Sequence, residues 1–358
     1  MEKSNTTNTN VNVILEYVWI DGYENLRSKI RILSAVKDEN NNLSLNVPNW
    51  NFDGSSTNQT KSRISDIILK PVRLFVNPFF EENSFLVLCE TFNPDNSPHE
   101  TNTRRNLDLN SEKYSSLESL FGIEQEYVLF GRNNLPYKWK EHNEPGCGGQ
   151  DKQSYYCGVG GDRCFGREIS NEHLQKCLKA GIKICGTNAE VMASQWEYQI
   201  GPLDALTVSD QLWMSRYILQ RITEKYDCYV SFHPKPYKGD WNGSGGHTNF
   251  STKKMREENG IEEIVNVCNK LEKYHMDHIK VYGQHNEERL SGNHETSNIN
   301  NYSFGVGERG SSIRIPLQVV LDRSGYLEDR RPASNLDPYL VCDRLQKTVM
   351  EEEVEYKE

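Results

Sequence analysis

The sequence lacks long apolar runs. A membrane-spanning helix needs about 20 mostly apolar residues, and a secretion signal needs a charged and then an apolar segment. No uncharged apolar stretch of that length occurs, and the first ten residues, MEKSNTTNTN, are polar. We therefore expect neither a membrane span nor a leader, and we expect a soluble, cytoplasmic protein.

Basic residues are also few relative to acidic ones. The 358 residues include 41 Lys and Arg against 51 Asp and Glu, which gives a formal net charge of -10. Such a chain repels phosphate backbones and anionic membrane surfaces, so we expect no nucleic-acid partner and no membrane partner. An acidic protein can still bind anionic substrates where divalent metal ions supply local positive charge.

Paired CxxC motifs are absent, although the chain has nine cysteines. Scattered cysteines in odd number, in a long chain without a leader, are typical of reduced thiols. We expect neither a disulfide framework nor a zinc site.

The length predicts two domains, because 358 residues exceed what one hydrophobic core usually organises. The polar start predicts a disordered or short N-terminal arm over residues 1–15. Short strand-like runs over residues 16–98 predict a small β-rich domain. We expect a second, larger domain over residues 103–358.

Two features of the smaller domain indicate strands. Apolar residues before and after Asp21-Gly22 predict a hairpin. Further along, apolar runs at 67–69 and 72–76 flank Pro71, and we expect two separate short strands there.

The larger domain mixes helices and strands. Amphipathic patterns predict helices at 170–180, 208–226 and 261–282. Between them lie strand candidates, at 122–130, 182–184, 196–200, 229–232 and 312–316. This order predicts an α+β fold with a mainly antiparallel sheet.

Two pairs of glutamates are candidate metal ligands. Glu124 and Glu126 lie two apart in an apolar strand, so both carboxylates share one face and repel each other unless a cation neutralises them. The alternative is a solvated strand face. Glu190 and Glu197 converge only if the chain turns at about 193–195, and the alternative is two unrelated glutamates at a rim.

His247 and a group of arginines are further candidates. His247 lies in the glycine-rich segment NGSGGHTNF and offers a nitrogen to a metal, or is a surface residue. The C-terminal third carries Glu328 and five arginines, which are Arg289, Arg309, Arg314, Arg330 and Arg331. Arginine suits planar recognition of carboxylate and phosphate oxygens, although surface ion pairs would also use it.

Together these residues indicate a reaction class. Oxygen-rich ligands with one imidazole favour Mg²⁺ or Mn²⁺ over zinc. Carboxylates that hold metal ions and arginines that bind anions are typical of enzymes that transfer phosphoryl groups. The residues by themselves predict a metal-dependent, phosphate-handling enzyme without a Walker-type loop, and they do not identify its substrate.

The joined motifs resemble glutamine synthetase of the eukaryotic type, and they occur in family order across nearly the whole chain. They are WNFDGSST (50–57), FGIEQEY (121–127), YYCGVGGDRCFGREI (155–169), GTNAEVMASQWEYQIGP (186–202), KPYKGDWNGSGGHTNFSTKKMREENG (235–260), HETSNIN (294–300), RGSSIRIP (309–316) and YLEDRRPASNLDPY (326–339).

The resemblance implies an N-terminal β-grasp domain, a larger catalytic domain, and a homo-oligomer of stacked rings, a decamer, whose active sites are shared by neighbouring subunits. It implies ATP-dependent ligation of ammonia to glutamate through γ-glutamyl phosphate. One Mg²⁺ or Mn²⁺ would be held by Glu126, Glu190 and Glu197. A second would be held by Glu124, His247 and Glu328, with His247 also near the substrate.

The resemblance also implies roles for other residues. The ATP contacts would be Asn249, Ser251, Arg314 and Tyr326. Glutamate would be held by Arg289, Asn242 and the Gly243 backbone, with Arg309 and Arg330 facing the transferring phosphoryl group. The ammonium site would use Asp53 and Ser56 of the adjacent subunit together with Tyr156 and Glu295, and Glu295 would also lie on a flap that closes over the acyl phosphate.

Three departures from the family pattern stand out. Asn293 precedes the flap residues where the family carries a large aromatic or apolar side chain, which predicts looser flap packing. Leu327 replaces a phenylalanine, and segment 146–154 diverges. Two alternatives remain within the same scaffold: a ligase that joins glutamate to a larger amine, and a ring-forming homologue without catalysis.

Overall fold

The computed structural model describes residues 9–38, 40, 42–60, 64–139 and 155–351. The chain divides into two compact units, Met1–Asn106 with Lys176–Ile182, and Leu107–Gln175 with Lys183–Glu358. Residues 1–8 of the expected arm and the divergent segment 146–154 lie outside the described residues. Residues 9–15, also expected in that arm, belong to a strand.

The first unit contains a six-stranded sheet in the order β3-β2-β1-β6-β5-β4. Its strands are β1 (Thr9–Ile20), β2 (Leu26–Lys37), β3 (Leu43–Ser44), β4 (Trp50–Asp53), β5 (Asp66–Val76) and β6 (Ser84–Phe92). The predicted hairpin is confirmed, because β1 pairs antiparallel with β2 from Ile20 and Leu26 outward. Strand β1 also pairs in parallel with β6.

The hydrophobic core of the first unit follows from strand alternation. Val13, Leu15, Tyr17 and Trp19 occupy every second position of β1 and are buried together in one cluster. Alternate residues of a strand point to the same face, so this one strand supplies a continuous apolar stripe.

Strand β5 corrects the expectation of two strands around Pro71. A single strand runs through the proline, and its pairing with β6 shifts register between Pro71 and Arg73. A bulge accommodates a residue that has no N–H to donate to the ladder, so the strand continues beyond it.

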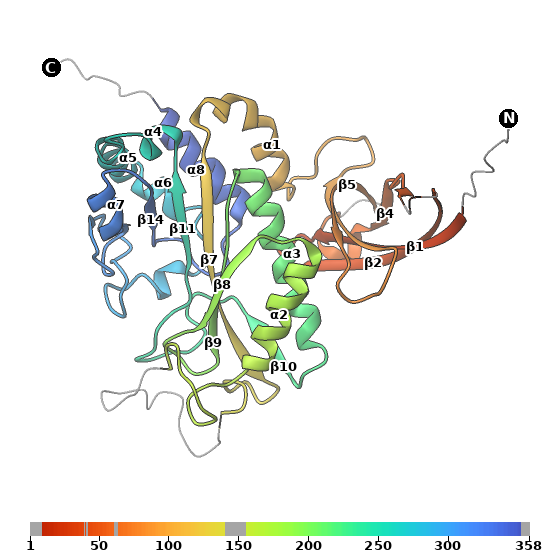
Figure 1. Cartoon of the computed structure of the whole chain (residues 1–358), viewed down its shortest axis with the longest axis horizontal. Coiled ribbons are helices and arrows are strands. Elements are labelled where there is room, and N and C mark those ends of the chain that lie inside the picture. Colours follow the sequence, from red (N-terminus) through yellow and green to blue (C-terminus); the bar gives the residue numbers. More distant parts are fainter. Residues whose placement is uncertain (1–8, 39, 41, 61–63, 140–154, 352–358) are drawn as a thin grey trace. The chain divides into compact units, whose positions relative to one another are not determined.

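The second unit contains an eight-stranded sheet in the order β12-β13-β14-β11-β7-β9-β8, with β10 paired to β7. Figure 1 labels β14, β11, β7, β9, β8 and β10 of this sheet. Its strands are β7 (Leu120–Gly131), β8 (Ile184–Ala189), β9 (Gln195–Leu203), β10 (Cys228–Ser231), β11 (Gly246–Ser251), β12 (Phe304–Val306), β13 (Ile313–Ile315) and β14 (Leu327–Asp329). All of its pairings are antiparallel except that of β12 with β13, so the expected α+β fold with a mainly antiparallel sheet is confirmed.

The helices are α1 (Thr103–Tyr114), α2 (Arg167–Ala180), α3 (Ala205–Thr223), α4 (Lys253–Arg256), α5 (Ile261–Lys273), α6 (His275–Ile279), α7 (Leu317–Asp322) and α8 (Pro338–Met350). Short 3-10 turns lie at η1 (Gly54–Thr57), η2 (Ser115–Leu117) and η3 (Asn286–Glu288). Among the described helices, none combines the length and apolar character that crossing a membrane requires.

Two predicted elements differ most from the structure, and the other predicted ends in the second unit differ by up to three residues. The expected helix over 261–282 is interrupted at Tyr274, whose backbone (φ -106°, ψ 19°) leaves helical geometry and separates α5 from α6. The expected strand at 182–184 begins only at Ile184, because the Ile182 amide donates to the Cys177 carbonyl and finishes the turn after α2.

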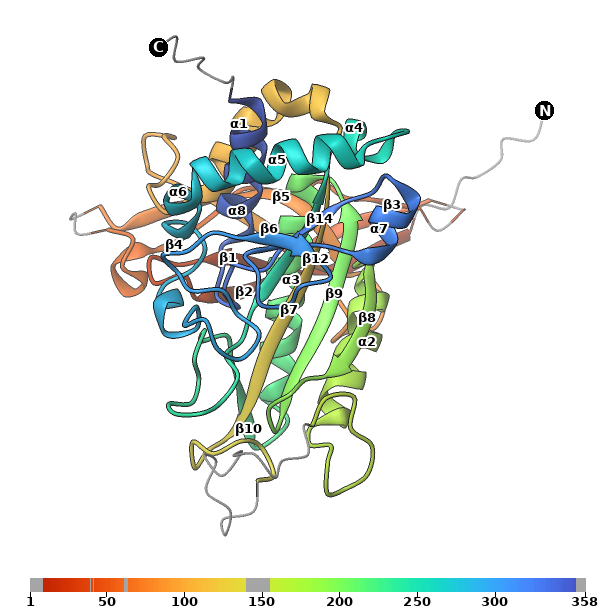
Figure 2. The ribbon, with the colours of Figure 1, turned by 90° about the vertical axis from the view of Figure 1, so that its left-hand side faces the viewer.

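Helix α3 forms much of the support beneath the larger sheet (Figure 2). It begins at Asp204, whose side chain accepts from the Thr207 amide, and most of its residues are buried against β7, β9 and β10. Helix α8 packs on α3, and the Tyr339 hydroxyl donates to Asp210 Oδ1 at 2.7 Å. The larger sheet therefore packs on a layer formed by α3 and α8, and this packing holds its strands in place.

Candidate active site

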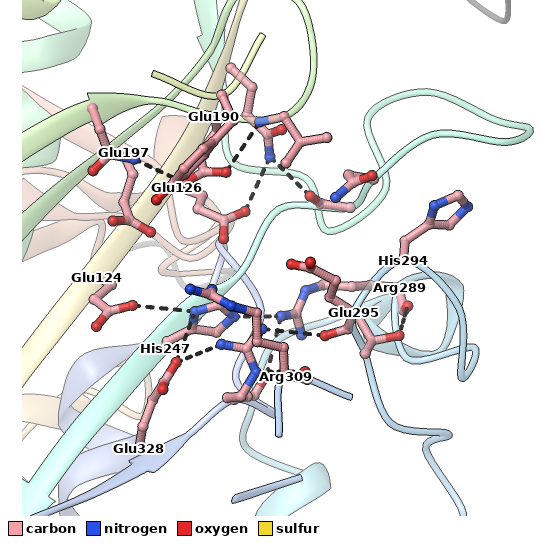
Figure 3. A pocket seen from close by; sticks show the side chains of 18 of the residues that line it. Glu124, Glu126, Glu190, Glu197, His247, Arg289, His294, Glu295, Arg309 and Glu328 are labelled. Carbon is pink, nitrogen blue, oxygen red and sulfur yellow. Dashed lines mark hydrogen bonds and ion pairs between the residues drawn. The ribbon is translucent and has the colours of Figure 1, made fainter. Parts of the chain in front are cut away.

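A cavity of about 570 Å³ lies in the second unit and collects most of the predicted site residues (Figure 3). The predicted residues among its lining are Glu124, Glu126, Tyr156, Glu190, Glu197, Asn242, Gly243, His247, Arg289, Glu295, Arg309, Arg314, Glu328 and Arg330. They come from segments far apart in the sequence.

Strand register explains why these side chains meet. Glu124 on β7 lies directly opposite His247 on β11, and Glu126 lies opposite Glu197 on β9. Residues opposite one another, and residues two apart on one strand, share a face of the sheet. The shared face predicted for Glu124 and Glu126 therefore points into the cavity.

One group of ligand atoms joins three adjacent strands. His247 Nδ1 lies 3.4 Å from Glu124 Oε2 and 3.6 Å from Glu328 Oε1. In Figure 3 these three side chains point toward one another, and all three ligand atoms lie within 4.8 Å of each other. This is the trio that the resemblance to the family assigned to one cation.

A second group consists of Glu126, Glu197 and His247, again within 4.8 Å. The resemblance placed Glu190 with Glu126 and Glu197. Glu190 lines the same cavity, but it belongs to neither group among the described residues. Its oxygens accept instead from Asn188 Nδ2 at 2.9 Å and from the Val191 amide at 3.1 Å.

The turn that brings Glu190 near Glu197 is confirmed. Strands β8 and β9 form an antiparallel hairpin in which Asn188 lies opposite Glu197. Ser194 closes the turn with a φ of 57°, and the Glu190 amide donates to the Gln195 carbonyl at 2.8 Å.

Burial and mutual repulsion shift the pKa of the acids. Burial raises the pKa of Glu126, although the Arg289 guanidinium opposes the rise. Burial, and then the Glu126 charge, raise the pKa of Glu190, while burial and the charges of Glu124 and Glu126 raise that of Glu197. Negative charge in this cavity is therefore costly without a cation.

His247 complements these acids. Burial, followed by the Arg330 charge, holds its pKa well below the ordinary range, so the ring is neutral and can offer a nitrogen. Carboxylate oxygens with one imidazole match the donors that Mg²⁺ and Mn²⁺ accept, and a divalent cation would offset the crowded charge. The residues present fit a pair of such ions.

Arginines surround the carboxylates. Arg314 Nη1 donates to Glu328 Oε2 at 2.7 Å, and Arg330 Nη1 donates to Glu328 Oε1 at 2.6 Å. Arg330 Nε also donates to the Arg309 carbonyl at 2.9 Å. The buried Arg289 places Nη2 3.0 Å from His247 Nε2. These groups supply positive charge on the side of the cavity nearest Glu328.

The sequence groups Arg331 with these arginines, but Arg331 lies outside the cavity that they line. It is fully buried, and its guanidinium pairs with Asp329 at 2.7 Å. It does not line either described cavity, and its contacts are structural.

A second cavity of about 410 Å³ adjoins the first through Glu124, which lines both. Three of the four predicted ATP contacts, Asn249, Ser251 and Tyr326, line it, whereas Arg314 lines the first cavity. Its other walls are mostly apolar or backbone, and they include Phe250 and Ile200. An apolar cavity beside an acidic, arginine-lined one suits a ligand with a flat ring and a charged tail.

Asp53 and Ser56 belong to the first unit and are not among the described residues that line these cavities. Both are exposed. Asp53 precedes η1 and accepts from the Ser55 hydroxyl at 2.7 Å and the Ser55 amide at 3.0 Å, and these bonds hold the pKa of its carboxyl below the ordinary value.

Sequence reasoning missed several polar residues of the first cavity, namely Asn188, Gln195, Gln199, His294 and Thr296. Gln195 and Gln199 were recognisable in SQWEYQIG, where they lie two residues on either side of Glu197 and so share its strand face. Asn188 carried no such signal, since its place depends on the pairing of β8 with β9.

Comparisons with known proteins match most of the chain to one family, glutamine synthetase. The family model described as glutamine synthetase, catalytic domain, matches residues 100–272, and the one described as glutamine synthetase, beta-Grasp domain, matches residues 11–94. The glutamine synthetase of Emericella nidulans is 48% identical over 94% of this chain and 92% of its own length. That of Candida glabrata is 49% identical over 95% and 89%, and that of Saccharomyces cerevisiae 48% over 94% and 89%.

Proposed function

The chain belongs to the glutamine synthetase family, and from this we propose that it joins ammonia to the γ-carboxylate of L-glutamate, converting ATP to ADP and phosphate. One observation carries the proposal. The first cavity holds two candidate groups of metal ligands that both contain His247, and Glu124 lines both this cavity and the apolar cavity beside it.

We assign two divalent cations to this site. Glu124, His247 and Glu328 would hold one, and Glu126 and Glu197, with Glu190 nearby, would hold the other. When bound, such cations neutralise phosphate oxygens and orient them for in-line transfer. The resemblance supports Mg²⁺ or Mn²⁺, and the donor atoms agree with either.

The substrates would lie in the two cavities. The apolar cavity would receive the adenine ring of ATP, with Asn249, Ser251 and Tyr326 as polar contacts, and Arg314 would contact the phosphates from the first cavity. Arg289 would hold the α-carboxylate of glutamate. Asn242 and the Gly243 backbone would hold its remaining polar groups.

The first step activates the acid. An oxygen of the glutamate γ-carboxylate attacks the γ-phosphorus of ATP, the bond to ADP breaks, and γ-glutamyl phosphate forms. Arg309 and Arg330 would stabilise the charge on the transferring group. As the resemblance implies, Glu295 would lie on a flap that closes and excludes water from this acyl phosphate.

The second step uses ammonia. Asp53 and Ser56 of a neighbouring subunit, with Tyr156 and Glu295, would attract the ammonium cation, which would give a proton to the Asp53 carboxylate. The nitrogen would then bond to the acyl carbon as the bond from that carbon to the phosphate oxygen breaks, and phosphate would leave with the second proton. This assignment requires the ringed homo-oligomer that the resemblance implies, because the described cavity residues come from the second unit alone. Hydrogen bonds from Ser55 keep Asp53 ionised for this task.

The test is an assay of the purified protein with ATP, Mg²⁺, glutamate and ammonia. We expect phosphate release and glutamine formation in equal amounts, and we expect Glu124→Ala to remove turnover while the oligomer survives. A requirement for a larger amine, or unchanged turnover in Glu124→Ala, would overturn the assignment.

A further inference from the structure

Gln195 makes contacts that neither the sequence motifs nor the proposed chemistry assigns. It is the first residue of β9, lines the first cavity, and is only 2% exposed. Its amide nitrogen lies 3.1 Å from Glu126 Oε2, 2.9 Å from the Gly243 carbonyl and 3.1 Å from Ser244 Oγ. One side-chain amide therefore connects a candidate metal ligand to the loop that would hold glutamate.

The loop that contains Gly243 also donates a hydrogen bond to Glu126 Oε2, the oxygen that Gln195 contacts. The Gly245 amide donates to Glu126 Oε2 at 2.8 Å, and the Glu126 amide donates to the Gly245 carbonyl at 3.1 Å. Both described donors to the Glu126 carboxylate act on Oε2, which leaves Oε1 for a cation. The orientation of this carboxylate thus depends on Gln195 and on Gly245.

Gln195 makes two further hydrogen bonds within the turn before β9. Its Oε1 accepts from the Met192 amide at 3.1 Å, and its backbone carbonyl accepts from the Glu190 amide at 2.8 Å. Groups that orient metal ligands in this way usually matter to affinity, because a ligand free to rotate loses entropy on binding.

We propose that Gln195 is a positioning residue that couples metal binding at Glu126 to glutamate binding at the Asn242–Gly243 loop. The inference rests on the proposed function of these two sites. A cation that fixes Glu126 fixes the Gln195 amide and hence the Gly243 carbonyl, and an ordered loop in turn favours the metal-binding orientation of Glu126. The coupling is reciprocal, as any linkage between two binding equilibria must be.

The test is Gln195→Met, which keeps most of the volume and removes all three donor contacts. Mn²⁺ binding is measured by electron paramagnetic resonance with no substrate present, and the KM for glutamate is measured at high and low Mn²⁺. We expect Mn²⁺ affinity to fall roughly 10- to 100-fold at one of the two ion sites. We also expect a higher glutamate KM that no longer depends on Mn²⁺, with a smaller change in kcat.

The matched control is Gln346→Met, another buried glutamine of the second unit, on α8 and outside both described cavities. It should leave Mn²⁺ affinity and the Mn²⁺ dependence of the glutamate KM unchanged. If Gln195→Met fails to fold, Gln195→Asn keeps the amide but shortens its reach by about 1.5 Å and should show the same pattern more weakly.

Parental Mn²⁺ affinity in the Gln195 variants, or a glutamate KM that keeps its full Mn²⁺ dependence, would overturn the inference. An inactive parent protein would instead defeat the proposed function, and the Mn²⁺ measurement would still decide whether Gln195 orients Glu126.

Discussion

At the residue scale, the site is a cluster of charged side chains, and the sequence identifies only some of the contacts among them. The pairing of Glu124 with His247 agrees with the trio that the resemblance assigned, because opposed positions on β7 and β11 hold them together. Arg331 shows the limit. It follows Arg330 directly after the end of β14, and its guanidinium turns back to pair with the buried Asp329 and does not line the cavity.

The Arg331–Asp329 pair yields a stability prediction. Both side chains are fully buried, and Asp329 Oδ2 also accepts from the Tyr282 hydroxyl at 2.6 Å. Asp329→Asn leaves a buried guanidinium without a counter-charge, so we expect the free energy of unfolding to fall by about 3–5 kcal/mol. Urea denaturation measures this.

The exposed Lys253–Glu118 pair is the control. Lys253→Ala should leave the urea midpoint unchanged, because exposed ion pairs contribute little. Equal midpoints for Asp329→Asn and the parent protein would show that the buried pair contributes nothing to stability.

At the element scale, local signals predicted β7, β9, β10 and β13 but not β11, β12 or β14, and tertiary packing decided where elements end. Glu190 and Glu197 could converge only if the chain turned between them, and the β8–β9 hairpin supplies that turn. Helix α8 was not foreseen, although Asp337 and Pro338 form a recognisable helix start. The break at Tyr274 had no local signal, since no glycine or proline interrupts 261–282.

Helix α2 supplies a pH-dependent prediction through His173. The ring is buried against Tyr198, at 4.6 Å between centroids, with Nε2 3.0 Å from the Ser215 carbonyl. Burial lowers the pKa of His173 to about 4. Between pH 6.5 and 4 the unfolded chain binds a proton that the folded chain does not, so stability falls as the pH falls through this window, by on the order of 3 kcal/mol from this residue.

The variant His173→Gln lacks that titration. Relative to the parent protein, it should be least stable near pH 7.5 and should regain stability as the pH approaches 4.5, as measured by urea midpoints across this range. A difference between variant and parent that stays constant with pH would refute the prediction.

At the scale of the whole molecule, the active site should be complete only in the assembly. Asp53 and Glu124 belong to different units of one chain, and we propose that they meet between neighbouring subunits. The idea that neighbouring subunits share each active site came from the resemblance to the family. No pattern within one sequence shows which copy of the chain completes a site.

Mixing two inactive variants tests the sharing. Asp53→Ala and Glu124→Ala should each abolish turnover, because each removes one side of every site. After dissociation and reassembly in equal amounts, random pairing should place intact surfaces together at about a quarter of the sites and restore about that fraction of activity. No recovery from reassembled oligomers would contradict sharing.

The central claim is that five glutamates and His247 form a site for paired cations, and counting bound Mn²⁺ per chain by electron paramagnetic resonance tests it most directly. The account predicts two ions in the parent protein and one in Glu124→Ala, and it predicts weaker binding in His247→Ala, chiefly of the ion that Glu124 and Glu328 would also hold. A parent protein that binds no Mn²⁺, or a Glu124→Ala variant that still binds two ions with parental affinity, would contradict it.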